Sequence, residues 1–370
     1  MKKILCVINY YYPYVSGVSE YARLLCEEFV EKGYRVTVIT SNHDKLPEEE
    51  IINGVKVLRA PIICKISKGT VSLSFILKAW KLSKKADMVN LHLPMLESGL
   101  LSILIDSRKI VPTYHCDVNL PSGILNRFIL KVMDFSNNIC LKRSRKIGVT
   151  SIDYMKHSRI AHRYVDKMIE AGAPIKKYSR VETTQDKNKK VIGFCGRIVE
   201  EKGIDVLLKA FEIVQKEENN VCLHIGGDYK KIAGGSIYES LDSYIQEHNI
   251  QNVKFLGKIP EEDMSKFYSS LDVFVLPSIN SLEAFGMVQI EAMMCGTPVV
   301  ASNLFGVRTI VKKTGMGEIA KVKDEKDLAE KILMVLRNRD QYIKSREYIE
   351  SLYGTEACAK SYIKNSIKGI

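Results

Sequence analysis

Apolar residues in this chain fall in short runs, separated by longer amphipathic stretches. In the first half, apolar runs predict buried strands at 4–8, 36–40, 55–58, 87–93, 110–115 and 146–150. Between them, apolar residues recur every three or four positions, which predicts helices at 19–32, 72–85, 97–108 and 122–142. Ser19 is the expected N-cap of the first helix and Gly33 its C-cap. This alternation implies right-handed crossovers and a parallel sheet.

The polar stretch 182–190, ETTQDKNKK, interrupts this rhythm and is the expected interdomain linker. After it, strands are expected at 191–195, 221–225, 253–257, 272–277, 298–302 and 318–322. Helices are expected at 204–217, 238–248, 261–270, 286–295 and 325–337, with two more near 340–352 and 355–368. Because single cores stop growing near about 250–300 residues, a chain of 370 residues favours two doubly wound α/β domains. Ligands of such domains bind at the carboxyl ends of the strands.

The composition is that of a soluble globular protein, with 46% apolar and 26% charged residues. No apolar run approaches the roughly 20 residues of a membrane-spanning helix, and the N-terminal apolar run is better interpreted as a first strand than as a signal peptide. Nine cysteines without C-x-x-C spacing indicate buried thiols in a reducing compartment and no zinc site. We therefore expect a cytoplasmic protein.

Positive charge is concentrated in one part of the chain. The net charge is +12, and residues 51–150 alone contain 16 Lys/Arg against 5 Asp/Glu. A lysine-rich solvated surface explains this equally well as a surface that meets anionic lipid or an anionic acceptor. The basic amphipathic stretch 68–85, with the chain's one Trp, is by default a helix that packs on the sheet, and interfacial membrane contact is the alternative. No nucleic-acid-binding pattern is present.

The strongest chemical signal is SLEAFGMVQIEAMMCGTPVVAS at 281–302. Glu283 follows an apolar strand by a short loop, and Gly286 then opens a helix that contains Glu291. The first amides of such a helix suit a diphosphate, and a glycine there permits its close approach. One glutamate alone would be a solvated helix charge. Two in this context predict contacts to sugar hydroxyls and to a ribose diol.

A second signal is GFCGRIVEEKG at 193–203, where a buried strand ends at Gly196 and a helix follows. Arg197 and Lys202 lie in the connecting loop. An arginine fork and a lysine point charge beside a helix N-terminus match a pyrophosphate. Loop cations of this kind are otherwise solubility residues, but their order here favours a binding role.

Three weaker signals lie in the first half. Gly17 belongs to a tight loop between the first strand and the first helix, where amides could approach a phosphate. His115 and Asp117 follow a predicted strand and His92 ends another, so all three are candidates to line the cleft, although a histidine at a strand end is usually structural. The G-x-G-x-x-A match at 315–320 leads into a strand, which is the reverse of a dinucleotide fingerprint.

Glu283 and Glu291, with AFG and EAMMCGTPVVAS behind them, and the GR…EKG pattern at 196–203 resemble the retaining family-4 glycosyltransferases of GT-B fold. The resemblance covers nearly the whole chain and is specific in 190–302. It implies catalytic roles for Glu283, Arg197, Lys202 and His115. It implies donor contacts from Gly17, Gly196, Gly227, Leu256, Ala284, Phe285, Gly286, Met287, Val288 and Glu291. His92 and Asp117 remain candidates elsewhere in the cleft.

The resemblance implies two Rossmann-like domains that face each other across a cleft. Residues 1–184 would bind the acceptor, 185–354 the donor, and the helix at 355–370 would cross back to the first domain. The activity implied is retaining, metal-independent and cofactor-free transfer of a hexose-type sugar. Its donor would be a nucleotide diphosphate sugar, with UDP the commonest in the family. Its acceptor would be a glycan or lipid-linked molecule, as in cell-envelope polysaccharide or glycolipid synthesis.

Two other functions fit the same residues. A nucleotide-sugar epimerase of GT-B type would turn over the donor without an acceptor. A non-catalytic subunit would bind nucleotide or lipid without turnover. The positive charge of the N-terminal half also allows a peripheral position on the cytoplasmic face of a membrane.

Overall fold

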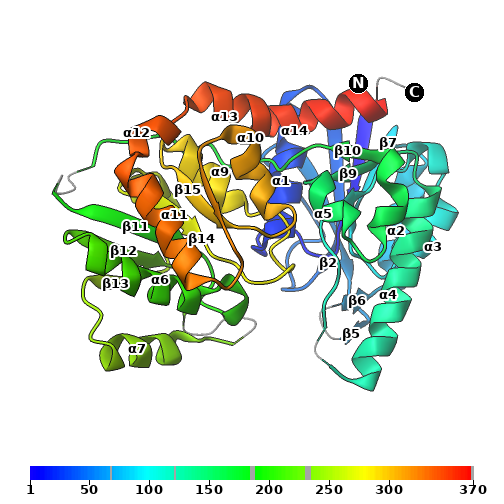
Figure 1. Ribbon diagram of the computed structural model, residues 1–370. Coiled ribbons are helices and arrows are strands. Elements are labelled where there is room, and N and C mark those ends of the chain that lie inside the picture. The colour runs from blue at the N-terminus through cyan, green and yellow to red at the C-terminus, as the bar shows by residue number, and fades with distance from the viewer. Residues whose placement is uncertain (67–68, 121, 184–187, 230–234, 368–370) are drawn as a thin grey trace. The chain divides into compact units, whose positions relative to one another are not determined.

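The computed structural model describes residues 1–66, 69–120, 122–183, 188–229 and 235–367 (Figure 1). The chain divides into two compact units. The first unit comprises Met1–Ile175 and Tyr353–Ile370, and the second comprises Lys176–Leu352. Both are parallel-sheet domains of Rossmann type, as the sequence predicted.

The first unit is built on an eight-stranded sheet with the order β10-β9-β8-β7-β1-β2-β4-β3. All neighbouring strands are parallel except β3 and β4. The six predicted strands are present, and β3 and β10 are short strands that the sequence analysis missed. The strands are β1 (Lys3–Val7), β2 (Arg35–Asn42), β3 (Glu49–Ile52), β4 (Val55–Pro61), β7 (Met88–Leu93), β8 (Thr113–Tyr114), β9 (Ile147–Val149) and β10 (Met168–Glu170), and β5 (Cys64–Ile66) pairs with β6 (Gly69–Val71) outside the sheet.

Strand β1 lies between β7 and β2, so the order of the strands reverses there. The chain runs outward from β1 through β2 to β4 and then returns to β7 on the other side of β1. In open parallel sheets, ligands bind at such a switch point, beyond the carboxyl ends of the strands. The loops that follow β1 and β7 therefore mark the candidate binding edge of this unit.

The main helices of the first unit form two groups. Helix α1 (Gly17–Glu31) packs against α14 (Thr355–Tyr362), while α3 (Ser98–Leu104) contacts both α2 (Leu73–Ser83) and α4 (Ile124–Arg143). The predicted N-cap of α1 is wrong, because Ser16 caps the helix. Ser19 is the third helical residue, and its hydroxyl accepts a hydrogen bond from the Ser16 amide, which completes a capping box. Shorter helices are α5 (Ile152–Lys156) and the 3₁₀ segments Ser107–Lys109 and Ala161–Lys167.

The second unit has a fully parallel sheet with the order β13-β12-β11-β14-β15-β16. Its switch point lies between β11 and β14, because the chain runs from β11 out to β13 and then returns to β14. The predicted strands are confirmed as β11 (Lys190–Cys195), β12 (Val221–Gly226), β13 (Val253–Gly257), β14 (Val273–Leu276), β15 (Val299–Ser302) and β16 (Gly317–Ala320).

One buried apolar cluster joins α6, α7 and α11 to one face of this sheet, with Phe194, Phe211 and Leu333 among its members. Helices α8 and α9 contact each other, and α10 packs on β15 and β16. The sequence analysis missed α10. The helices are α6 (Ile204–Glu217), α7 (Tyr238–Glu247), α8 (Met264–Ser269), α9 (Met287–Met294), α10 (Val307–Thr314), α11 (Glu325–Arg337), α12 (Arg339–Tyr342) and α13 (Arg346–Tyr353), with 3₁₀ segments Glu200–Lys202 and Glu261–Asp263.

The division between the units lies before the expected linker, at 175/176 and not at 184/185. Residues just after the division are tied to the 3₁₀ segment Glu261–Asp263 and to the start of α8. Lys176 Nζ lies 2.7 Å from a Glu261 carboxylate oxygen, the Tyr178 hydroxyl donates to the other at 2.6 Å, and the Ser179 amide donates to Ser265. Composition marked the polar stretch as a break, but these contacts assign the residues before it to the second unit. Residues 184–187 of that stretch lie outside the described residues.

The C-terminal segment completes the core of the first unit, where α14 lies beside β9 and β10 (Figure 1). Tyr362 is fully buried, and its hydroxyl lies 2.7 Å from Thr113 Oγ1 and 3.2 Å from the Tyr21 hydroxyl. Gly148 on β9 leaves the space for this ring, since a Cβ there would overlap it. The segment is therefore part of the first unit's interior.

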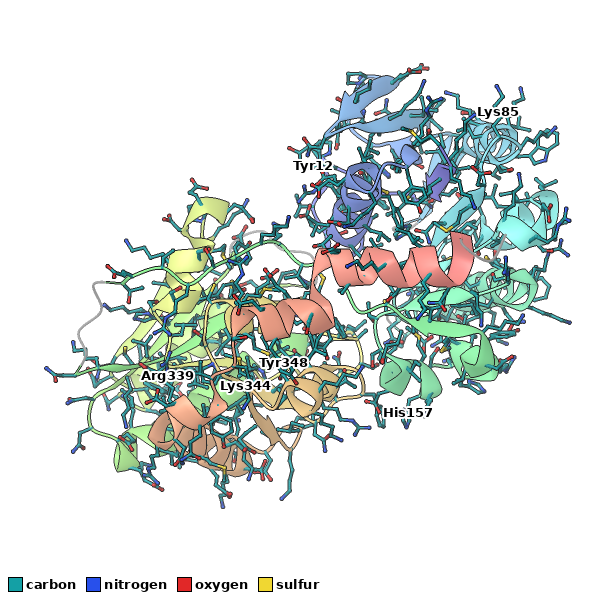
Figure 2. All side chains as sticks on the ribbon, turned by 90° about the horizontal axis from the view of Figure 1, so that it is seen from above. Tyr12, Lys85, His157, Arg339, Lys344 and Tyr348 are labelled. Atoms are coloured by element: carbon teal, nitrogen blue, oxygen red, sulfur yellow. The ribbon has the colours of Figure 1, made fainter. Side chains whose placement is uncertain are left out.

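Replacing Tyr362 by Phe should lower the free energy of unfolding of the first unit by about 1–2 kcal/mol, because two buried hydroxyls lose a partner. Differential scanning calorimetry of the full chain measures this. Tyr348→Phe is the matched control, since the Tyr348 hydroxyl donates to a backbone carbonyl on an exposed surface (Figure 2). Its effect should stay within about 0.5 kcal/mol. Equal effects of the two substitutions would contradict the buried role of Tyr362.

Candidate active site

Two loops meet at the switch point of the second unit, one after β11 and one after β14. The Ile279 amide donates to the Glu201 carbonyl at 3.0 Å, which joins their backbones. Gly203 has a left-handed φ of 65°, and a Cβ there would overlap the Pro277 carbonyl. Only glycine allows this approach. The backbone thus fixes both loops in one arrangement.

This arrangement brings Lys202 and Glu283 into direct contact. Lys202 Nζ forms an ion pair with Glu283 Oε2, and the buried Ser278 hydroxyl donates to the same oxygen at 3.3 Å. Both charged side chains are mostly buried, with exposed fractions of 19% and 13%. Partly buried charges stay paired because an unpaired one would lose its hydration without compensation. The sequence assigned these residues to phosphate and sugar separately, and the structure shows them as one charged group.

Arg197 lies in the same loop and is paired in another way. Its guanidinium donates to Glu201 Oε1 at 2.7 Å, and its side chain is half exposed. Glu201 also supplies the carbonyl that joins the two loops. The orientation of Arg197 is therefore coupled to the loop arrangement that positions Lys202.

Gly286 is the N-cap of α9 and has a left-handed φ of 81°. A Cβ there would lie 2.5 Å from the Leu276 side chain, so the position requires glycine on two grounds. Within the described residues no side chain caps this helix, whose first residues are Met287 and Val288. Its N-terminal amides can therefore receive an anion. The loop before it contains Ala284 and the buried Phe285.

Gln289 fixes the loop that precedes α9. It is fully buried, and its Nε2 donates to the carbonyls of Phe285 and Val307, both at 3.2 Å. The sequence analysis did not single out this residue. Its only signal was a polar side chain on an otherwise apolar face of the helix.

Glu291, in the second turn of α9, is oriented by a buried tyrosine. The Tyr268 hydroxyl donates to Glu291 Oε2 at 2.8 Å. Burial and the nearby Glu291 carboxylate raise the pKa of Tyr268 well above its ordinary value, so this tyrosine remains a hydrogen-bond donor.

Glycines connect the carboxyl ends of the neighbouring strands. The Gly196 amide donates to the Gly226 carbonyl at 3.0 Å, and the Gly227 amide donates to the Gly257 carbonyl at 2.8 Å. Gly227 has a φ of 143°, and a Cβ there would overlap the Gly196 carbonyl. This edge therefore presents backbone to a ligand and few side chains.

Leu256, also assigned to the donor, is partly exposed and lines a pocket of about 430 Å³. Neither Lys202 nor Glu283 is among the described residues that line it. The structure thus gives Leu256 a different environment from that of the charged group. The other lining residues are Thr183, Val191, His224, Ile259, Asp263, Lys266, Phe267 and Ser270.

In the first unit the structure brings His92 and His115 together. His92 Nδ1 lies 3.0 Å from His115 Nε2, and the Tyr21 ring meets the His115 ring edge-on. Burial lowers the pKa of His115 to about 3. Burial and the neighbouring His115 lower the pKa of His92 well below its ordinary value. Both rings are neutral near pH 7, so one donates its N–H and the other accepts it.

Asp117 has a structural position. Its carboxylate accepts hydrogen bonds from the Tyr114 and Ser158 hydroxyls and the Arg159 amide, each at 2.7 Å. These bonds tie the loop after β8 to the segment after α5. Gly17 is the first residue of α1, and a Cβ there would meet open space. The fold itself therefore does not demand a glycine at this position.

Sequence reasoning missed Glu97, which lies beside the switch point of the first unit. It follows β7, is buried, and accepts a hydrogen bond of 3.3 Å from Asn9, which follows β1. Burial raises the pKa of Glu97. The available signal was an isolated carboxylate shortly after a mostly apolar strand, and no periodicity marks such a residue.

The described residues contain no cluster of His, Cys, Asp and Glu that could hold a metal ion. The eight cysteines whose side chains are described carry free thiols, and five of them are buried. In the described part of the chain, no helix combines the length and hydropathy needed to cross a bilayer.

Comparisons with known proteins match both units. Residues 15–158 match the model of "Glycosyltransferase Family 4", and residues 176–351 match that of "Glycosyl transferases group 1". The D-rhamnosyltransferase WbpZ of Pseudomonas aeruginosa is 26% identical over 80% of this chain and 77% of its own. The phosphatidyl-myo-inositol mannosyltransferase of Mycobacterium leprae is 24% identical over 92% of this chain and 90% of its own.

Among solved structures, Anabaena HepE in complex with UDP and glucose has a TM-score of 0.71 and 15% identity, covering 100% of both chains. At this identity the likeness concerns the fold, and the fold is GT-B. The two family models carry the assignment of activity. The chain therefore belongs to the family-4 glycosyltransferases of GT-B fold and is a glycosyltransferase.

Proposed function

We propose that this enzyme transfers a hexose-type sugar from a nucleotide diphosphate donor, a UDP-sugar, to a glycan or lipid-linked acceptor. Transfer retains the anomeric configuration and uses neither a metal ion nor a cofactor. The observation that carries the proposal is the charged group at the β11/β14 switch point, where Lys202 and Glu283 lie beside the loop of Arg197 and the glycine-capped start of α9. This unit binds the donor.

The chemical problem is the departure of a nucleoside diphosphate from the anomeric carbon. The bond from C1 to the β-phosphate oxygen breaks, and a bond from C1 to the acceptor oxygen forms on the same face. The acceptor proton passes to the departing phosphate oxygen. Negative charge grows on that phosphate, and Lys202, Arg197 and the α9 amides stabilise it. Met287 and Val288 supply the first of these amides.

When the donor binds, Lys202 exchanges its partner, from the Glu283 carboxylate to the diphosphate. An arriving diphosphate competes with Glu283 for the Lys202 ammonium, because both are anions. Once the lysine turns to phosphate, the carboxylate can accept hydrogen bonds from hydroxyls of the transferred sugar. Glu291, oriented by Tyr268, accepts from the ribose diol.

The acceptor contacts the first unit in this proposal. His115 offers a neutral imidazole to a sugar hydroxyl, and Glu97 with Asn9 provides a second polar group beside β1. The free thiols and the requirement for nucleotide sugars support a cytoplasmic location. Nucleic acid is not a proposed partner.

Relatives support the donor and the acceptor classes. HepE was crystallised with UDP and glucose. The M. leprae relative is named for transfer of mannose to phosphatidyl-myo-inositol, and the P. aeruginosa relative for transfer of D-rhamnose. Together they favour an acceptor of the cell envelope.

A thermal-shift screen of nucleoside diphosphates and their sugars tests the donor. UDP and one UDP-sugar should raise the unfolding temperature most, since a ligand that binds only the native state stabilises it. If only GDP or only ADP raised the unfolding temperature, the base of the donor would be guanine or adenine and not uracil. Release of UDP that requires an added acceptor then separates transfer from donor turnover without one.

Lys202→Ala and Arg197→Ala should each reduce kcat/KM for transfer by about 2–4 kcal/mol of transition-state stabilisation, as expected for loss of a donor to a developing oxyanion. Arg337→Ala is the matched control, because Arg337 pairs with Glu217 and Glu218 at the carboxyl end of α6 in the same unit. The control should transfer like the wild type. Near-wild-type rates for Lys202→Ala would contradict the role of this cation.

Glu283→Gln should abolish most transfer while leaving UDP affinity unchanged or tighter. Its carboxylate no longer competes with phosphate for Lys202, but the sugar loses an anionic acceptor. Isothermal titration with UDP and initial-rate assays measure the two effects. Parallel loss of UDP affinity and transfer would show that Glu283 only holds the loop.

Acidification should destabilise the first unit before most carboxylates titrate. The folded-state pKa of His115 is about 3 and lies below the unfolded value of about 6.5, so its stabilisation is complete above about pH 6.5 and is lost as pH falls toward 3. The slope is up to about 1.4 kcal/mol per pH unit for each such histidine.

His115→Asn should reduce this slope between about pH 7 and pH 5, measured by denaturant unfolding. His157→Asn, at an exposed histidine of the same unit (Figure 2), should leave the slope unchanged. An unaltered slope in His115→Asn would refute burial of a neutral ring.

A further inference from the structure

The first half of α4 buries no side chain. In this helix of 20 residues the first buried position is Ser136, three turns after the start. Before it, Ile124, Leu125 and Phe128 are 88%, 70% and 65% exposed, and Phe135 is 68% exposed. An amphipathic helix normally turns its apolar residues to the core. Here large apolar side chains point to solvent instead.

Neighbouring helices extend this exposure. α3 packs against α4 and also contacts α2, so the three helices adjoin one another. Each has large apolar side chains that are exposed. We call this set the apolar face, and it consists of Leu73, Leu77, Leu100, Ile103, Leu104, Ile124, Leu125, Phe128, Val132 and Phe135. Scattered exposed apolar residues are normal, but a set gathered on adjoining helices marks an interaction surface.

The charges on these helices are almost all positive. α2 contains Lys78 and Lys81, and the first half of α4 contains Arg127 and Lys131. Neither α2 nor α3 contains an acidic residue, and the single acid of α4, Asp134, is held by the Arg159 guanidinium at 2.6 and 2.9 Å. In Figure 2, Lys85, just after α2, and Tyr12, in the loop after β1, lie on different sides of this unit. The end of α2 is thus separate from that loop.

We propose that the apolar face docks the first unit on an anionic lipid bilayer, with the first half of α4 lying in the interface. A helix with large apolar residues on one side and Lys or Arg on the other binds in this way, by apolar insertion together with attraction to anionic headgroups. Within the basic region 51–150, the sequence analysis singled out 68–85 as the amphipathic segment, and the structure adds α4 to it. Lys68 of that stretch lies outside the described residues.

Charge complementarity selects a bilayer over a second copy of this chain. A two-fold dimer would place the same face against itself. The lysines and arginines of α2 and α4 would then meet their own copies with few carboxylates to offset them. An anionic membrane offers both the apolar layer and the opposite charge.

The inference goes beyond the proposed sugar transfer and does not depend on it, because docking is measured without donor or acceptor. The probes are vesicles of phosphatidylcholine, with and without phosphatidylglycerol, at low salt. The wild-type chain should sediment with the mixed vesicles, less with neutral ones, and less at high salt. A wild-type chain that remains in the supernatant with anionic vesicles would overturn the proposal.

The double variant Leu125→Glu/Phe128→Glu should lose about tenfold or more in vesicle affinity, because it places charge where apolar side chains insert. Both residues are exposed, so the thermal unfolding of the variant should match that of the wild type. Ile51→Glu is the matched control, since Ile51 is 75% exposed on the edge strand β3 of the same unit. It should bind like the wild type. Equal binding by the double variant would refute the role of α4.

The chain's single Trp gives a direct reading of the docked state. Trp80 lies on α2, seven residues after Leu73 and three after Leu77, which places it on their side of the helix. Brominated phospholipids should quench its fluorescence in the wild type and not in the double variant. Sedimentation velocity distinguishes docking on a bilayer from dimerisation through the apolar face. A wild-type dimer that the double variant converts to a monomer, without vesicle binding, would show that the face is a self-association surface.

Discussion

The candidate donor site depends on one backbone constraint in the second unit. The loops after β11 and β14 touch through the Ile279 amide and the Glu201 carbonyl, and Gly203 makes room for the approach. This backbone contact positions the two loops so that the Lys202 ammonium meets the Glu283 carboxylate. The positive end of α9 begins at the same edge, where Gly286 adopts a conformation that other residues avoid. Charge and backbone dipoles are therefore preorganised for an anion.

The polar groups of the first unit differ in charge from those of the second. Near the switch strand, His92 and His115 form a buried pair of uncharged rings. The C-terminal segment belongs to this same interior, because Tyr362 bonds to residues of β8 and α1. One unit thus concentrates charge at its switch point, which in the proposed function receives a diphosphate. The other buries neutral hydrogen-bonding groups, which in the same proposal meet the hydroxyls of an acceptor.

Much of this architecture follows from the sequence, because hydrophobic periodicity decides elements that are long or fully buried. Helix α6 and strand β13 have the predicted bounds, and the order of motifs placed Arg197, Lys202 and Glu283 on one sheet edge. Local chemistry that depends on tertiary contacts was less accessible. Ser16 and Ser19 are both good N-caps, and only the geometry of the turn decides between them. The unit boundary was misplaced because hydrogen bonds to α8 and to the 3₁₀ segment before it, and not composition, hold residues 176–181. Hydrophobic periodicity predicted neither the buried carboxylate of Glu97 nor the exposure of the apolar side chains of α4.

The central claim is that Lys202 and Arg197, together with the start of α9, form the diphosphate site. A crystal structure of the protein with bound UDP tests it most directly. The β-phosphate should lie within hydrogen-bond distance of Lys202 Nζ and of the Met287 or Val288 amide, with Glu283 released from the lysine. A β-phosphate bound elsewhere, with the ion pair of Lys202 and Glu283 intact, would contradict it.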